Sequence, residues 1–156
     1  RSTLTAQRLT SGDLSAGRAL FEKSCASCHR LFGHGGTIGP DLTGSQRSNL
    51  HYLLENIIDP SATVSKNYHM TIVLLEDGRV LSGIITAPTE RTLTLQMPTE
   101  QIVIARDEIE AIRESELSMM PDRQLDVLSP AEIRDLVGYL MSPHQVPLPR
   151  IPDGPQ

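Results

Sequence analysis

The chain has 156 residues, a length that suits one domain or a small domain with a substantial insertion. Its 14 basic and 19 acidic residues give a net charge of -5, which argues against nucleic acid or an anionic membrane as a partner. No run of about 18 apolar residues occurs, so the sequence predicts no membrane span. Aromatic residues make up only 3%. A core this poor in large rings leaves room for a bulky non-protein group.

Residues 1–12 carry no charged-then-apolar leader, and we expect them to be a terminal extension. Because the chain starts at Arg1 rather than Met, we expect a processed protein or a piece of a longer one. Asp13 is a good N-cap, and the apolar residues after it have helical spacing. Gly17 and Phe21 lie one turn apart on this predicted helix, which places a notch beside a bulky ring.

The helix runs into Cys25-Ala26-Ser27-Cys28-His29, which contains both cysteines of the chain. C-x-x-C-H is the pattern of covalent haem attachment. Residues three apart share one face of a helical turn, so both thiols can add to the two vinyl groups of one haem. His29 then projects under the iron as the proximal ligand. The sequence predicts one haem c, bound through Cys25 and Cys28.

Three other interpretations of the motif compete with haem attachment. A thioredoxin-like redox pair requires a βαβ context and has no need of the histidine. A zinc site requires four ligands, and recruiting His34 or His51 fits no common finger spacing. A disulfide across two intervening residues is strained and closes almost no loop. The haem interpretation therefore ranks first.

After the motif, the sequence predicts a helix over residues 48–58, which Asp59-Pro60 ends. From Tyr68 the apolar period changes from helical to alternating, and an Asp-Gly pair at 77–78 is a strong hairpin signal. We expect an inserted β module over residues 69–114. Its predicted strands cover residues 70–75, 80–86, 92–97, 101–105 and, less regularly, 107–113.

The sequence does not decide the role of this β module. Five short strands faintly resemble a small Sm-like or SH3-like barrel, but few basic residues occur and no RNA binding follows. The strands either cover one face of the haem and extend the core, or form a docking surface for a dehydrogenase or redox partner, or form a dimer interface. No residue pattern separates these roles.

The last part of the chain opens with Ser118-Met119-Met120-Pro121. Ser129-Pro130-Ala131-Glu132 then reads as a capping box with proline at the first helical position. It begins a strongly amphipathic helix that contains Tyr139. Residues 143–156 are rich in proline and lack a periodic pattern, so we expect a linker or terminal extension.

Three of these segments together resemble the class I cytochrome c family. They are residues 13–29, Gly39-Pro40-Asp41-Leu42, and Met120-Pro121 with the last helix. More narrowly, residues 17–142 resemble a haem-binding domain of planctomycetes and verrucomicrobia that is often the C-terminal module of large secreted dehydrogenases.

The resemblance implies roles for several residues. The first and last helices would cross through Gly17, Phe21 and Tyr139. The carbonyl of Pro40 would accept a hydrogen bond from the proximal imidazole, and we expect Pro40 and Leu42 to bind the cofactor. Such a hydrogen bond fixes the tautomer of the ring and makes it a more basic ligand.

The distal ligand is implied by the same resemblance. Class I cytochromes place a methionine before the last helix, which matches Met120, with Met119 as the fallback. His51, His69, His34 or an open coordination position are the remaining options. A thioether stabilises ferrous iron, so ligation by histidine and methionine raises the potential and leaves no open position for oxygen or peroxide.

The expected fold is a mainly α cytochrome c fold of class I over residues 13–142, with the β module inserted at 69–114 (α+β overall). The expected function is single-electron transfer, with electrons from a fused or partner dehydrogenase. The chain is expected to be an electron carrier and not an enzyme, and to be periplasmic or exported, because haem is attached outside the cytoplasmic membrane.

Two other functions remain in view. A haem enzyme or a gas or redox sensor requires a displaceable distal ligand, and the loop around His34-Gly35-Gly36 is weak evidence for one. A binding module in which the β strands are the functional part comes third.

Overall fold

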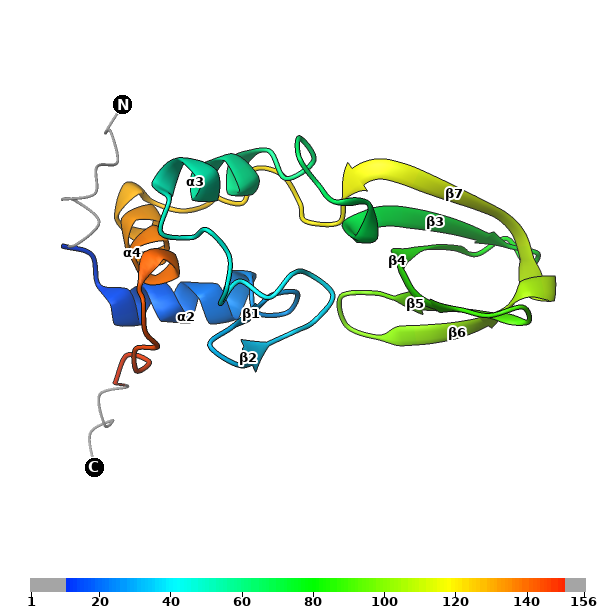
Figure 1. Cartoon of the computed structure of the whole chain (residues 1–156), viewed down its shortest axis with the longest axis horizontal. Helices are drawn as coiled ribbons and strands as arrows, with labels where there is room; N and C mark the ends of the chain where they lie inside the picture. The colour runs from blue at the N-terminus through cyan, green and yellow to red at the C-terminus, as the bar shows by residue number, and fades with distance from the viewer. Residues whose placement is uncertain (1–10, 151–156) are drawn as a thin grey trace.

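The structure is a computed structural model that describes residues 11–150. It has a helical part and a sheet part, which lie side by side along the longest axis of the molecule (Figure 1). Most of the predicted extension at 1–12, and the last residues of the predicted linker at 143–156, lie outside the described residues.

Within residues 11–150, the helical part holds three α-helices and one small ribbon. The helices are α2 (Leu14–Ser24), α3 (Leu50–Ile58) and α4 (Pro130–Met141), and the ribbon pairs β1 (Arg30–Leu31) with β2 (His34–Gly35). The N-cap Asp13 accepts from the backbone N–H groups of Ser15 and Ala16, both at 3.0 Å. At α4, Ser129 and Glu132 form the predicted capping box.

The sheet part lies between α3 and α4 in the sequence. Its five antiparallel strands have the order β6-β5-β4-β3-β7. The strands are β3 (His69–Leu75), β4 (Val80–Pro88), β5 (Thr92–Gln96), β6 (Gln101–Ala105) and β7 (Ile109–Ser118), with short 3-10 turns η1 (Lys66–Tyr68) and η2 (Arg106–Glu108) before the first and last of them.

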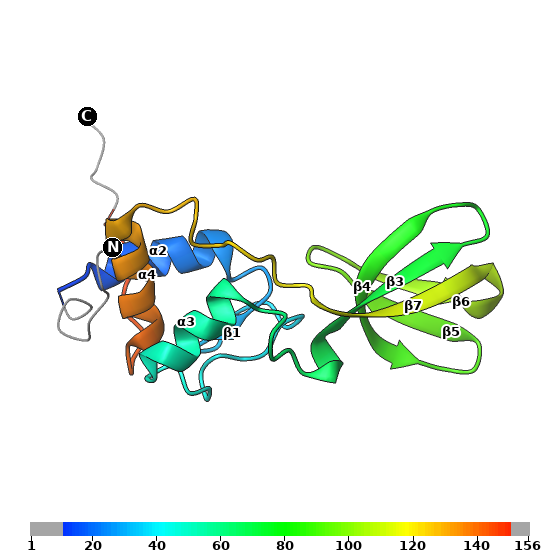
Figure 2. The same cartoon turned by 90° about the horizontal axis from the view of Figure 1, so that it is seen from above.

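Strand β4 belongs to both halves of this curled sheet (Figure 2). Its residues 80–83 pair with β3, and its residues 84–88 pair with β5. Gly83 lies where the pairing changes. A Cβ atom at Gly83 would be 2.5 Å from the carbonyl oxygen of Gln96, so the sheet bends where only glycine leaves enough space.

The prediction of a mainly α fold is wrong. The structure is 27% helical and 29% strand, and it is a mixed α+β fold, the wider description that the prediction also allowed. The reason is that the helices are short and the segments that join them are mostly loops, whereas the sheet part holds most of the strand residues.

Two separate hydrophobic clusters stabilise the two parts. The cluster of the helical part includes Phe21, Leu53 and Tyr139, all buried. The cluster of the sheet includes Val73 and Leu95, each with no exposed surface. Each part therefore buries apolar surface of its own, which is the main favourable term in folding.

Helices α2 and α4 cross at Gly17, as the resemblance implies. A Cβ atom there would be 2.0 Å from the carbonyl oxygen of Asp135 and 2.8 Å from Cβ of Tyr139. The ring of Phe21, one turn further, lies 5.7 Å from that of Tyr139 in a tilted arrangement. The crossing sets the direction of α2, and therefore the place where the Cys-x-x-Cys-His segment begins.

We predict that Gly17→Ala lowers the free energy of unfolding by about 1–3 kcal/mol, because the new methyl group meets rigid backbone. Gly44→Ala is the matched control, since a Cβ there has no atom within 4 Å. It is expected to leave stability unchanged or slightly higher. Denaturant unfolding of both variants measures the difference. Equal stability of the two variants would contradict the close crossing.

Candidate haem site

The Cys-x-x-Cys-His segment continues α2 by one further turn. Helix α2 ends at Ser24, and the N–H groups of Cys28 and His29 donate to the carbonyl of Cys25 at 3.1 and 2.9 Å. Both cysteines are half-buried, and neither forms a disulfide. The tight turn presents both sulfur atoms and the imidazole within five residues of chain.

A glycine-rich loop, residues 35–39, packs directly against this turn. The N–H of Gly36 donates to the carbonyl of Ala26 at 2.7 Å, and that of Gly39 donates to the carbonyl of Cys28 at 2.8 Å. A Cβ at Gly35, where φ is +113°, would lie 2.1 Å from the carbonyl oxygen of His29. Backbone therefore meets backbone without side chains between, which any residue other than glycine would prevent.

The imidazole of His29 is oriented by the end of the same loop. Its Nδ1 lies 3.0 Å from the carbonyl oxygen of Pro40, and a Cβ at Gly39 would be 2.8 Å from its Cε1. A carbonyl oxygen only accepts hydrogen bonds, so Nδ1 donates, and in the neutral ring Nε2 then keeps its lone pair. This leaves Nε2 as the nitrogen able to bind a metal.

The environment of Cys25 favours its neutral thiol. Burial, and after it the neighbouring Cys28, raises the pKa of Cys25 to about 11. Redox-active cysteine pairs work through a thiolate and have lowered pKa values. The raised pKa therefore argues against a thioredoxin-like dithiol at this position.

Met120 lies against the core of the helical part. It is half-buried and packs on the same hydrophobic cluster as Cys25 and Leu42. Met119 is also half-buried but is not among the residues that pack on that cluster. Of the two candidate methionines, only Met120 packs on the cluster that Cys25 also contacts.

The other candidate histidines are His34, His51 and His69. His34 is exposed on β2, and the side chain of His51 is 89% exposed beside Glu55. His69 begins β3 and helps to line a hollow of about 290 Å³ on the sheet, with Thr71, Ile84 and Ile112 among its walls. This hollow includes neither cysteine of the motif nor His29. Within residues 11–150, no three His, Cys, Asp or Glu side chains group as metal ligands.

Arg47 fixes the loop that follows Pro40, a role that the sequence analysis missed. Its guanidinium donates to the carbonyl of Leu140 at 2.9 Å and to that of Ser142, at the C-terminal end of α4. It also lies 4.7 Å from the centre of the Phe32 ring. Burial lowers the pKa of Arg47. A cation at a helix C-terminus is favourable, so one side chain ties the loop to α4.

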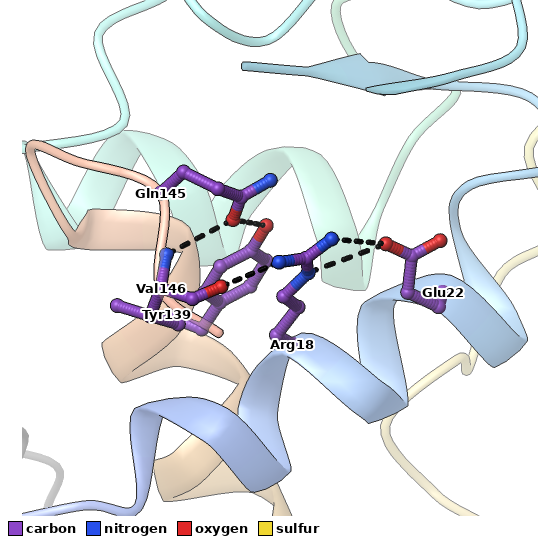
Figure 3. Close-up of polar contacts among 5 residues, drawn as sticks. All are labelled: Arg18, Glu22, Tyr139, Gln145 and Val146. Atoms are coloured by element: carbon purple, nitrogen blue, oxygen red, sulfur yellow. Dashed lines mark hydrogen bonds and ion pairs between the residues drawn. The ribbon is translucent and has the colours of Figure 1, made fainter. Parts of the chain in front are cut away.

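The segment after α4 is held against the helices. Gln145 accepts from the hydroxyl of Tyr139 at 2.8 Å, and the carbonyl of Val146 accepts from Arg18 at 2.6 Å (Figure 3). Arg18 also approaches Glu22 on its own helix at 3.4 Å (Figure 3). The first residues of the predicted linker at 143–156 thus contact both α2 and α4, although they form neither helix nor strand.

The comparisons with known proteins agree with this geometry. Residues 14–74 match the family model described as Cytochrome c. No curated protein matches the chain significantly. The family match supports the class I cytochrome c family, and with it a haem-binding, electron-transfer role and covalently bound haem c. No helix within residues 11–150 is long and apolar enough to cross a membrane.

The residues present are suited to haem. Two half-buried thiols lie on one turn, and beside them is an imidazole with a free Nε2. The thioether of Met120 lies on the same apolar cluster as Cys25. Two thiols, an imidazole and a thioether are the donor set of haem c with histidine and methionine ligands.

We predict that Arg47→Ala lowers the free energy of unfolding by about 2–3 kcal/mol, since two carbonyl groups lose a charged donor in a buried place. Arg79→Ala is the matched control, because its ion pair with Asp77 is 66% and 53% exposed. That variant is expected to change stability by less than about 1 kcal/mol. Thermal or denaturant unfolding checks both values, and a similar loss in the two variants would contradict the anchoring role.

Proposed function

We propose that this chain is a c-type cytochrome domain that transfers single electrons. The observation that carries the proposal is the shared cluster: Met120 and Cys25 both pack against the hydrophobic cluster of the helical part, and the motif also holds an imidazole whose Nδ1 is engaged by Pro40. Bound haem supplies an iron that changes between its ferrous and ferric states by one electron.

The residues of the chain have separate tasks in this proposal. Cys25 and Cys28 would hold the haem through two thioethers, and His29 would bind its iron through Nε2. Pro40 holds the imidazole ring and makes it a more basic ligand. Met120 would be the second protein ligand, and its soft sulfur would favour the ferrous state and close the site to small gases.

The setting of the domain follows from the same proposal. Electrons come from a redox protein or from a dehydrogenase fused to this domain, and the domain is periplasmic or otherwise exported. The resemblance to the planctomycete and verrucomicrobial haem-binding domain supports such a dehydrogenase. The net charge of -5 favours a partner with a basic docking surface.

We predict that the wild-type ferrous protein does not bind carbon monoxide readily, whereas Met120→Ala does. Loss of the thioether is also expected to lower the midpoint potential, by on the order of 100 mV, because ferrous iron loses a soft ligand. Visible spectra with and without carbon monoxide, and a redox titration, measure both effects.

Two methionine variants serve as controls. Met119→Ala and Met97→Ala are expected to stay closed to carbon monoxide, since neither residue packs on the cluster of the helical part. If Met119→Ala opens the site and Met120→Ala does not, the ligand is Met119. Ready binding by the wild type would contradict the electron-transfer proposal and favour a gas sensor or haem enzyme.

A further inference from the structure

The chain enters and leaves the sheet through two neighbouring strands. β3 is the first strand after the helical part and β7 is the last, and the two pair along most of their length (Figures 1 and 2). At the end of the sheet that meets the helical part, the paired residues are His69 and Ser118. Met120 follows only two residues later. The position of this methionine is therefore tied to the end of the sheet.

Ser118 is the last residue of β7 and connects the sheet to the loop that contains Met120. Its hydroxyl accepts from the backbone N–H of Met120 at 3.1 Å, which fixes the direction in which the chain leaves the strand. Its own backbone N–H donates to the hydroxyl of Ser61, also at 3.1 Å. Ser118 is half-buried, so both hydrogen bonds are partly shielded from water.

Ser61 connects this joint to the helical part. It lies just after α3, next to the buried Pro60, and α3 buries Leu53 and Ile57 in the cluster on which Met120 packs. A short series of contacts thus runs from the core of the helical part through Ser61 and Ser118 to Met120. Ser118 is fixed at the end of the sheet, and Ser61 is fixed just after the end of α3.

We propose that the inserted sheet positions the distal ligand, with Ser118 and Ser61 as the positioning residues. The inference rests on the proposed function, because it takes Met120 as the residue that binds iron. The pairing of β3 with β7 holds the strand end, Ser61 holds Ser118 against the helical part, and Ser118 sets the backbone of Met120. The β module then helps to place the residue that binds iron.

Ser115 provides a matched control on the same strand. Its hydroxyl accepts from the N–H of Leu117 at 3.2 Å, two residues ahead, in the same pattern as Ser118 and Met120. Leu117 is 57% exposed and is not a candidate ligand. Removing the hydroxyl of Ser115 or of Ser118 costs one local hydrogen bond, but only the bond of Ser118 involves Met120.

The test uses the full, haem-loaded chain and added imidazole, which competes with the thioether for ferric iron. We expect Ser118→Ala and Ser61→Ala to raise the apparent affinity for imidazole about fivefold, the equivalent of one typical hydrogen bond. The weak red absorbance band of a ferric sulfur–iron bond is expected to lose intensity in parallel. Ser118→Thr, which keeps the hydroxyl, restores both, and Ser115→Ala behaves as the wild type.

The outcomes separate this proposal from the one on which it rests. If Met120→Ala keeps the red band, the ligand assignment fails. If Met120→Ala loses the band while Ser118→Ala and Ser61→Ala keep wild-type affinity for imidazole, the ligand stands and the positioning role is overturned. An equal shift in Ser115→Ala also overturns it, since a general loosening of β7 would then explain the effect. If Ser118→Ala fails to acquire haem, Ser61→Ala provides the test. That variant keeps the hydrogen bond between Ser118 and Met120 and removes only the one between Ser61 and Ser118.

Discussion

The hydrogen bond between Nδ1 of His29 and the carbonyl of Pro40 is the contact on which the site depends. It forms because residues 35–39 lie against the turn that carries the cysteines, so closely that a Cβ at Gly36 would be 2.2 Å from the carbonyl oxygen of Ser27. The bond fixes the ring, leaves Nε2 free and makes the imidazole more basic. The rest of the helical part holds the two partners together: α2 ends at the turn, α4 crosses α2, and Arg47 ties the loop after Pro40 to the end of α4.

Local signals predicted much of this arrangement. The N-cap Asp13 and the capping box at the start of α4 are short patterns with a direct physical cause, and both helices begin where these patterns place them. The helix predicted over 48–58 begins two residues later in the structure, at Leu50. The cause is Asn49, which caps the helix by accepting from the N–H of Tyr52 at 3.2 Å. Strands β3 to β6 lie within two residues of their predicted bounds, whereas the short strands β1 and β2 were not predicted. Alternating apolar residues and an Asp-Gly turn are sufficient for that.

Features that depend on distant partners were not predictable. Strand β7 is an edge strand with charged residues at several positions, so its alternation is weak and its extension to Ser118 was missed. Arg47 looks like an ordinary surface arginine in the sequence, because its two acceptors lie more than 90 residues further along the chain. The contact of Ser118 with Ser61 likewise joins residues 57 positions apart.

Covalent attachment of one haem through Cys25 and Cys28 is the central claim, and intact-mass measurement tests it most directly. The chain, expressed with a cytochrome maturation system and then denatured, is predicted to keep an added mass equal to one haem. Peptide mapping is predicted to place this mass on the fragment that contains both cysteines, and Cys25→Ser with Cys28→Ser is predicted to lose it. A denatured wild-type chain that carries no added mass, with two thiols free to react with an alkylating reagent, would contradict the account.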